Sequence, residues 1–89
     1  EGYPVPGADV VDYLLASGKK GVGLDTVSVD PVGDEALPIH RRLLGGGLVI
    51  VENLTNLAAA GGEPFTFCAL PLHYEKADGA PVRAVGLWL

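Results

Sequence analysis

Two periodicities of apolar residues alternate along the chain and divide it into short helices and strands. In ADVVDYLLA, residues 8–16, apolar side chains recur at positions i, i+3 and i+4, which predicts an amphipathic helix. Gly18 follows this stretch and suits the left-handed backbone conformation that often ends a helix. The stretches IHRRLL, residues 39–44, and NLTNLAAA, residues 53–60, predict two further short helices. Glycines follow both stretches, so each helix is expected to end there.

The strongest strand signal is LVIV, residues 48–51, an uninterrupted aliphatic run typical of a strand buried on both faces. FTFCALPL, residues 65–72, and VRAVGLWL, residues 82–89, predict two strands that pair with each other. Asp78 and Gly79 lie between them and form a turn signal. A hairpin is therefore expected at the end of the chain.

A weaker extended region lies between the first two predicted helices. GVGLD, residues 21–25, predicts a short strand, and TVSVD, residues 26–30, alternates polar and apolar residues as a half-exposed extended segment does. The loop-like stretch PVGDEALP, residues 31–38, follows. Together these elements predict an α/β fold, with two or three short helices packed on a mixed sheet that has residues 48–51 at its centre.

Composition narrows the class of protein. The 89 residues suffice for one domain, and 48% of them are hydrophobic while 19% are charged, which excludes a disordered segment. The formal net charge of −5 and the lack of a large basic cluster argue against nucleic-acid binding. No apolar run approaches the roughly 18 residues of a membrane-spanning helix. We therefore expect neither nucleic acid nor a membrane as a partner.

Cys68 is the single cysteine, so the chain cannot form an internal disulfide. It lies within the apolar stretch of residues 65–72, where a free cysteine usually behaves as a small buried hydrophobe. A chain without structural disulfides is expected in a reducing compartment, and the cytoplasm is the default expectation.

His40 and Glu52 are the side chains with the clearest potential for chemistry. Glu52 comes directly after the aliphatic run of residues 48–51, where an isolated buried charge would be very costly. The two residues lie 12 positions apart, so they can meet if that strand returns past the proline turn before His40. Imidazole and carboxylate are ligands of divalent ions. On residue types alone, however, a lone His and a lone Glu are more often ordinary polar side chains.

Four stretches, taken in their order and spacing, resemble the C-terminal part of the cyclase family of metal-dependent hydrolases, which includes kynurenine formamidases and isatin hydrolases. They are GLDTVSVDP, PIHRRLL, IVENLTNL and ALPLHYEKADGAPVRAV, at residues 23–31, 38–44, 50–57 and 69–85. The family also carries a His-x-Gly-Thr-His-x-Asp motif in its N-terminal half, which does not occur in this sequence. The chain starts at Glu1 and has no methionine. We therefore expect residues 1–89 to be the C-terminal portion of a single cyclase-like domain.

The resemblance implies a partial swivelling β/β/α fold and metal-dependent hydrolysis of an amide or cyclic amide, with zinc or manganese as the ion. It implies that His40 and Glu52 are metal ligands, and it assigns no catalytic acid or base within this chain. Asp25, Ser28 and Arg83 are candidates for the pocket or for supporting the ligands. From the residues alone, Asp25 and Ser28 are also explained as turn-forming side chains, and Arg83 as a solvent-facing charge.

Two ligands do not complete a tight metal site, because such sites usually have three or four protein ligands. We therefore expect the chain to be inactive alone and to need an N-terminal-half chain or a homo-oligomer partner. The alternative interpretation is a truncated, non-enzymatic module that folds and oligomerises. A third interpretation is a small acidic binding domain unrelated to the family.

Overall fold

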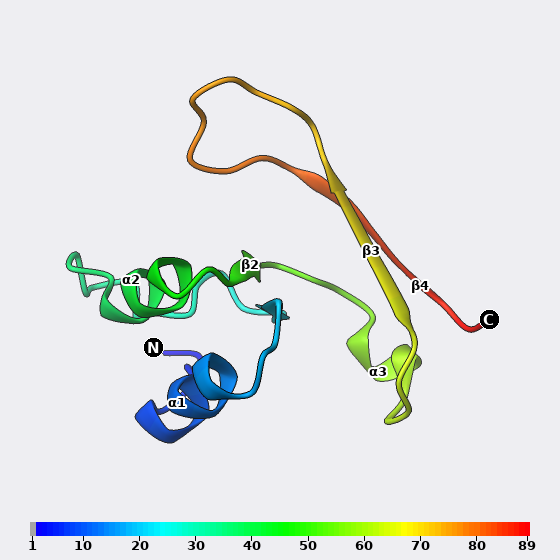
Figure 1. The fold of residues 1–89 in the computed structure, drawn as a ribbon, viewed down its shortest axis with the longest axis horizontal. Coiled ribbons are helices and arrows are strands. Elements are labelled where there is room, and N and C mark those ends of the chain that lie inside the picture. The colour runs from blue at the N-terminus through cyan, green and yellow to red at the C-terminus, as the bar shows by residue number, and fades with distance from the viewer. Residues whose placement is uncertain (1) are drawn as a thin grey trace. The chain divides into compact units, whose positions relative to one another are not determined.

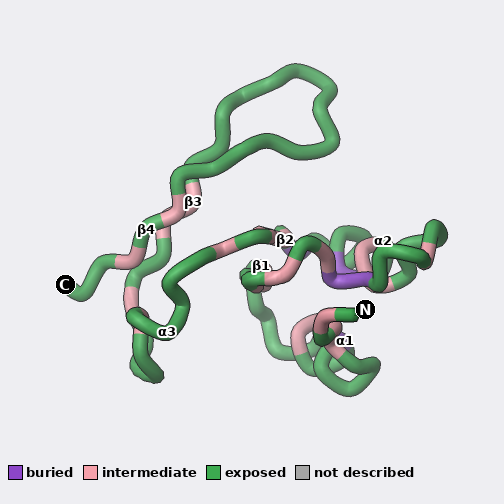
Figure 2. Tube along the Cα trace, turned by 180° about the vertical axis from the view of Figure 1, so that it is seen from behind, coloured by how far each residue is buried: buried purple, intermediate pink, exposed green. Residues whose placement is uncertain are grey.

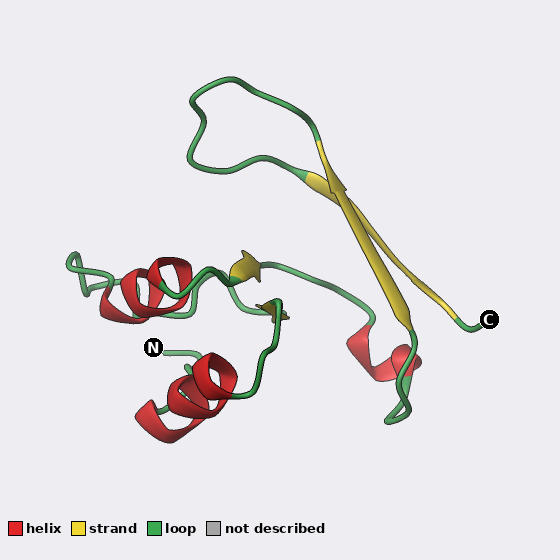
Figure 3. Cartoon of the chain, viewed as in Figure 1, coloured by secondary structure: helices red, strands yellow, loops and turns green. Residues whose placement is uncertain are grey.

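A computed structural model describes residues 2–89, which form two compact units, residues 2–55 and 56–89. The first unit contains two helices and a two-stranded sheet, and the second contains a short helix and a hairpin (Figure 1, with the element types coloured in Figure 3). Each unit is described separately below.

The two helices of the first unit begin and end close to the predicted positions. Helix α1 spans Ala8–Ala16, as the apolar spacing predicts, and Gly18 beyond it has a φ of +74°. Helix α2 spans Pro38–Gly45, two residues longer than predicted. Pro38 occupies the first turn, where a missing N–H costs nothing because the first helical N–H groups have no partner within the helix.

Strands β1, Gly21–Gly23, and β2, Val49–Val51, pair in parallel, with Gly21 opposite Val49 and Gly23 opposite Val51. Parallel neighbours need a crossover connection, and α2 lies within that connection. A Cβ atom on Gly21 would lie 2.5 Å from the carbonyl oxygen of Val49, so this close backbone approach requires glycine.

The core of the first unit is small and aliphatic. Its buried side chains are Val11 of α1, Leu43 of α2, Leu48 just before β2, and Val29 in the connection from β1 to α2. Figure 2 colours the buried segments of the chain purple. The partly buried side chains around them include Leu14 and Ile50. This cluster holds α1 and α2 together and fixes the two ends of the crossover between β1 and β2.

In the second unit, helix α3 spans Leu57–Ala60, and strands β3, Thr66–Pro71, and β4, Val82–Leu87, pair in antiparallel. The predicted C-terminal hairpin is therefore confirmed. Beside it, Phe65 and Trp88 stack with ring centroids 5.0 Å apart. Cys68 in β3 is partly exposed rather than buried.

The predicted α/β class with short helices is confirmed, while the arrangement of the strands differs. The described residues form one parallel and one antiparallel pair in place of a single mixed sheet. The run of residues 48–51 is not buried on both faces, because Val49 is 60% exposed and β2 pairs only with β1 within residues 2–89.

Two local predictions were wrong for backbone reasons. The helix predicted at residues 53–60 begins only at Leu57, since Asn53 and Asn56 adopt positive φ angles of 60° and 62° that interrupt a helix. Residues 26–30 form a bent segment rather than an extended one. Within residues 2–89, no helix has the length and apolar character needed to cross a membrane.

The core predicts a strong contrast between two adjacent leucines of α2. Leu43 is 0% exposed and Leu44 is 55% exposed. Leu43→Ala should lower the free energy of unfolding by about 2–5 kcal/mol, because it leaves a cavity in a small core. Leu44→Ala should change it by less than about 0.5 kcal/mol. Urea unfolding followed by circular dichroism measures both, and equal effects would contradict the assigned core.

Candidate functional site

His40 and Glu52 lie side by side in the first unit. His40 is in the first turn of α2, and Glu52 follows the last residue of β2. The Nε2 atom of His40 is 3.0 Å from Oε2 of Glu52. Both side chains are partly exposed, at 22% and 31%. The strand therefore does return past the turn before His40, and the two predicted residues form one site.

Backbone pairing fixes the position of Glu52. The N–H of Leu24 donates to the carbonyl of Val51 (3.0 Å), and the N–H of Asn53 donates to the carbonyl of Thr26 (2.9 Å). These bonds flank Glu52 on both sides and extend the β1–β2 pairing past the strand ends. The carboxylate is therefore presented from a tethered segment and not from a free loop.

Asp30 lies on the opposite edge of the imidazole ring and is fully buried. Its Oδ1 accepts the backbone N–H of Ile39 (2.9 Å). Its Oδ2 accepts the backbone N–H of His40 (2.8 Å) and lies 2.9 Å from Nδ1 of the same residue. The carboxylate thus supplies acceptors for N–H groups in the first turn of α2, where the helix dipole also favours negative charge.

The main chain of Asp30 is itself anchored. Its N–H donates to the Oγ of Ser28 (3.0 Å), and the hydroxyl of Tyr3 donates to its carbonyl oxygen (2.7 Å). The hydroxyl of Thr26 donates to the carbonyl of Ser28 (3.1 Å). Ser28 therefore supports the site indirectly, as a turn-forming side chain that holds Asp30.

Opposing effects set the pKa of Asp30. Burial by itself raises the pKa of the carboxyl, but hydrogen bonds from the His40 and Ile39 backbone and from the His40 ring lower it by more. The net result is a pKa below the ordinary value of 3.8, so the carboxylate is ionised at neutral pH. An ionised carboxylate accepts hydrogen bonds only, and an N–H at Nδ1 of His40 would donate to it across the 2.9 Å contact.

The donor types at the outer edge of the ring suit a divalent metal ion. An imidazole with its proton on Nδ1 offers the Nε2 lone pair, and Glu52 offers a carboxylate oxygen next to it. Asp30 faces the other ring nitrogen and therefore does not join these two as a third ligand. Among residues 2–89, no group of three or more His, Cys, Asp or Glu side chains is arranged to hold a metal ion. The residues fit part of a metal site.

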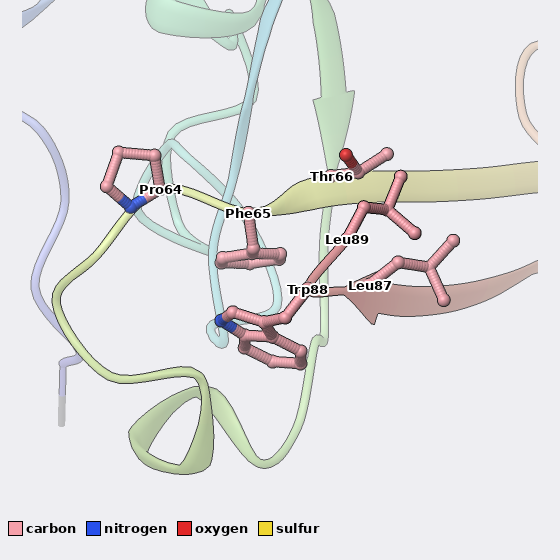
Figure 4. Close-up of a pocket in the computed structure, with 6 residues that line it drawn as sticks. All are labelled: Pro64, Phe65, Thr66, Leu87, Trp88 and Leu89. Atoms are coloured by element: carbon pink, nitrogen blue, oxygen red, sulfur yellow. The ribbon is translucent and has the colours of Figure 1, made fainter.

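The other sequence candidates lie elsewhere. Asp25 is exposed and follows β1 by two residues. Arg83 is an exposed residue of β4, in the second unit. His73, the second histidine of the chain, is exposed in the connection between β3 and β4. A shallow pocket in the second unit is lined by Pro64, Phe65, Thr66, Leu87, Trp88 and Leu89 (Figure 4). None of the side chains that line it titrates near neutral pH, so it has no acid–base chemistry of its own.

Asp30 was missed as a site residue, because the sequence pattern placed it in the half-exposed extended segment predicted at residues 26–30. A signal for it was present. Leu37 precedes Pro38 at the start of α2 and cannot accept hydrogen bonds through its side chain. With an apolar residue at that position, the first N–H groups of the helix need an acceptor from elsewhere in the chain or from water.

Comparisons with known proteins indicate the class of protein to which this fold is similar. A solved structure described as a potential metal-dependent hydrolase with cyclase activity superposes with a TM-score of 0.73 and 26% identity. The match covers 94% of this chain and 41% of that one. No protein-family model matches the chain.

Curated relatives give a more specific result. Kynurenine formamidase of Bacillus thuringiensis (strain Al Hakam) is 41% identical over 78 residues, and those of Bacillus mycoides (strain KBAB4) and Bacillus cytotoxicus are 40% and 37% identical. Each match covers 88% of this chain, and the chain spans 37% of the length of each relative. The chain is thus related to the metal-dependent hydrolases of the cyclase type, and the predicted resemblance to kynurenine formamidases is confirmed. Its assignment to the C-terminal portion of such a protein stays a prediction.

Asp30 should make the stability of the first unit depend on pH. Because its pKa in the folded chain lies below 3.8, the ionised carboxylate stabilises the fold above that pH and loses this effect as the pH falls. Asp30→Asn removes the titrating group. Its urea midpoint should be lower than that of the wild type at neutral pH and should change less between about pH 5 and about pH 2.

Asp34→Asn is the matched control for this experiment. Asp34 lies in the same loop, and its carboxylate accepts only one N–H, that of Ala36. The control should keep the pH profile of the wild type. Parallel profiles for wild type and Asp30→Asn would show that the carboxylate of Asp30 does not carry this pH dependence.

Proposed function

We propose that this chain supplies part of the active site of a metal-dependent amide hydrolase, with His40 and Glu52 as two of the metal ligands. The observation that supports this most directly is the 3.0 Å contact between His40 Nε2 and Glu52 Oε2, on a ring held from behind by a buried carboxylate. Histidine ligands of metals typically donate their second ring N–H to such a carboxylate. The relatives named kynurenine formamidase support a formamide as the substrate class.

In the proposed site, His40, Glu52 and Asp30 would have different roles. A bound zinc or manganese ion would supply an activated water and polarise the carbonyl of the amide. His40 would donate the Nε2 lone pair, and Glu52 would bring a negative charge that balances part of the charge of the ion. Both side chains are partly exposed, which leaves the site open to substrate from solvent. The buried Asp30 keeps the ring in place.

The chain by itself is proposed to have little or no hydrolytic activity. Catalytic zinc sites in proteins usually have three protein ligands, and this chain contributes two. The remaining ligands and the acid or base would come from another part of a longer protein, from a separate chain carrying that part, or from a second copy. This proposal follows from the ligand count at the site.

The alternative is a non-enzymatic module that folds and oligomerises. It draws support from the second unit, in which the large side chains Leu70, Leu72 and Trp88 are each at least 60% exposed. An apolar surface of this kind commonly binds another protein surface. The two functions differ in whether the His40 and Glu52 side chains are needed.

A chimera tests the proposed function. The matched segment of the Bacillus thuringiensis kynurenine formamidase is replaced by the corresponding 78 residues of this chain, and hydrolysis of an aryl formamide is followed with zinc or manganese present. The chimera should be active. His40→Ala or Glu52→Gln within it should lower kcat/KM by more than about 100-fold, because loss of even a residue that only supports a ligand costs 10–100-fold.

His73→Ala is the matched control, since His73 is exposed in the other unit. It should leave the activity of the chimera unchanged. A chimera that folds and stays inactive would favour the non-enzymatic module. A chimera that keeps its activity after His40→Ala would exclude His40 as a ligand.

The metal site also predicts a binding result for the 89-residue chain itself. Titration with zinc against a chromophoric chelator should show weak binding, because two ligands hold an ion less tightly than three or four. His40→Ala should abolish this binding and His73→Ala should not change it. Equal binding by wild type and His40→Ala would contradict the assignment.

A further inference from the structure

The hairpin of β3 and β4 is apolar on both of its faces. Residues directly opposite each other in an antiparallel pair lie on the same face, and the register places Phe67 opposite Gly86 and Thr66 opposite Leu87. The face that contains Phe67 has no polar side chain: Phe67, Ala69, Pro71, Val82, Ala84 and Gly86. The other face has one hydroxyl and one charge: Thr66, Cys68, Leu70, Arg83, Val85 and Leu87. Strands that are apolar on both sides are typical of sheets covered on both sides.

The structure shows no such cover within the second unit. No residue of β3 or β4 is buried, and Figure 2 has no purple segment in either strand. Helix α3 of the same unit has no buried residue either. A two-stranded hairpin by itself is marginally stable in water at best. Among residues 56–89, therefore, the hairpin lacks the cover that its composition calls for.

The edges of the hairpin are open as well. Within residues 2–89, β3 and β4 pair only with each other, so each strand keeps one edge of unpaired backbone groups. Soluble proteins commonly protect such edges with lysines, prolines or bulges. Here the register runs through consecutive pairs without a bulge, neither strand contains a lysine, and Pro71 stands only at the end of β3. The edges are able to accept a further strand.

We propose that this hairpin docks against the part of a cyclase-type hydrolase that lies outside the segment matched by this chain, and that this polypeptide covers both faces. The inference rests on the proposed function for the identity of the partner. The partner presents apolar side chains to both faces. It also presents a carboxylate to Arg83, because a charge that loses its water needs an opposite charge.

The lengths of the similar proteins support this partner. The solved hydrolase structure superposes on 94% of this chain, and the match uses 41% of that structure's own chain. The uncovered 6% of the 89 residues is about five residues, which is less than either six-residue strand, so the match includes residues of both strands. More than half of that chain, and of each formamidase relative, remains to pack on the shared part.

A second copy of this chain fits the hairpin less well. Each copy has a formal net charge of −5, and like net charges oppose association. Arg83 is the only charged residue in β3 or β4. Two hairpins packed face to face would therefore bury this guanidinium without supplying a carboxylate from the strands.

Amide hydrogen exchange compares the hairpin in two contexts, both without metal. One is the 89-residue chain, and the other is the chimera described above, built so that the segment from this chain continues through Leu89. The amides of β3 and β4 should exchange at least about 100-fold more slowly in the chimera, because covered strands open only together with the surrounding domain. Equal exchange rates in the two contexts would overturn the proposal.

Lysine substitutions in the chimera test each face separately. Val82→Lys places a charge on the face of Phe67, and Leu87→Lys places one on the opposite face. Each should lower Tm by more than about 5 °C, because the covering polypeptide removes water from an unpaired charge. Val32→Lys is the matched control, since Val32 is 75% exposed in a loop of the first unit. It should lower Tm by less than about 2 °C.

The outcomes separate this inference from its alternatives. If both hairpin variants are tolerated as well as Val32→Lys, the hairpin is open in the longer protein and the proposal is wrong. Sedimentation equilibrium of the 89-residue chain should show a monomer. A dimer that Leu87→Lys dissociates would assign the hairpin to a second copy instead.

None of these measurements depends on activity. A protected hairpin in an inactive chimera would support the docking surface and contradict the proposed hydrolase function. An active chimera that tolerates both lysines would support the function and overturn the docking surface.

Discussion

The buried carboxylate of Asp30 is the interaction on which the first unit depends. An ionised group without solvent contact is tolerable only when its oxygens are fully satisfied, and here three N–H groups do so. Two of these groups belong to the start of α2, which has no capping side chain of its own. A single residue thus stabilises the helix start and contacts the ring of His40. Stability and the candidate site cannot be varied separately at this position.

The parallel pairing of β1 and β2 provides the second constraint. Because the crossover between these strands contains α2, the end of β2 and the start of α2 come to the same place, and His40 meets Glu52 there. Hydrogen bonds that continue beyond the strands hold Glu52 in line. Backbone geometry therefore brings the imidazole of His40 and the carboxylate of Glu52 together. Their contact does not require a large core.

The second unit contributes differently. Its hairpin is regular, yet its side chains are at most partly buried, and several large apolar residues are exposed. The chain spans 37% of the length of its kynurenine formamidase relatives, and an exposed apolar hairpin is consistent with packing against further protein. The site described here is thus a part of a catalytic centre in the proposed function, with both of its ligands in the first unit.

The sequence alone determined most of the helices and strands and one possible pairing of site residues. The apolar spacing predicted α1 at its observed bounds, α2 within two residues, the terminal hairpin, and the pairing of His40 with Glu52 as a possibility. These features depend on local periodicity, on turn residues and on the cost of an isolated charge, all of which are visible in a short window. The late start of α3 was not predictable in this way, because Asn53 and Asn56 adopt left-handed conformations that the apolar pattern did not indicate.

Only the tertiary structure decided the role of Asp30 and the division into two sheets. Asp30 lies ten positions from His40, and the apolar Leu37 before α2 indicates that an acceptor is needed without indicating which residue supplies it. Its role arises from where the loop of residues 31–37 returns the chain, and burial of that carboxylate is a property of the packed unit. Sequence determined that His40 and Glu52 are residue types that can bind a metal ion, and long-range packing determined which nitrogen of His40 faces Glu52.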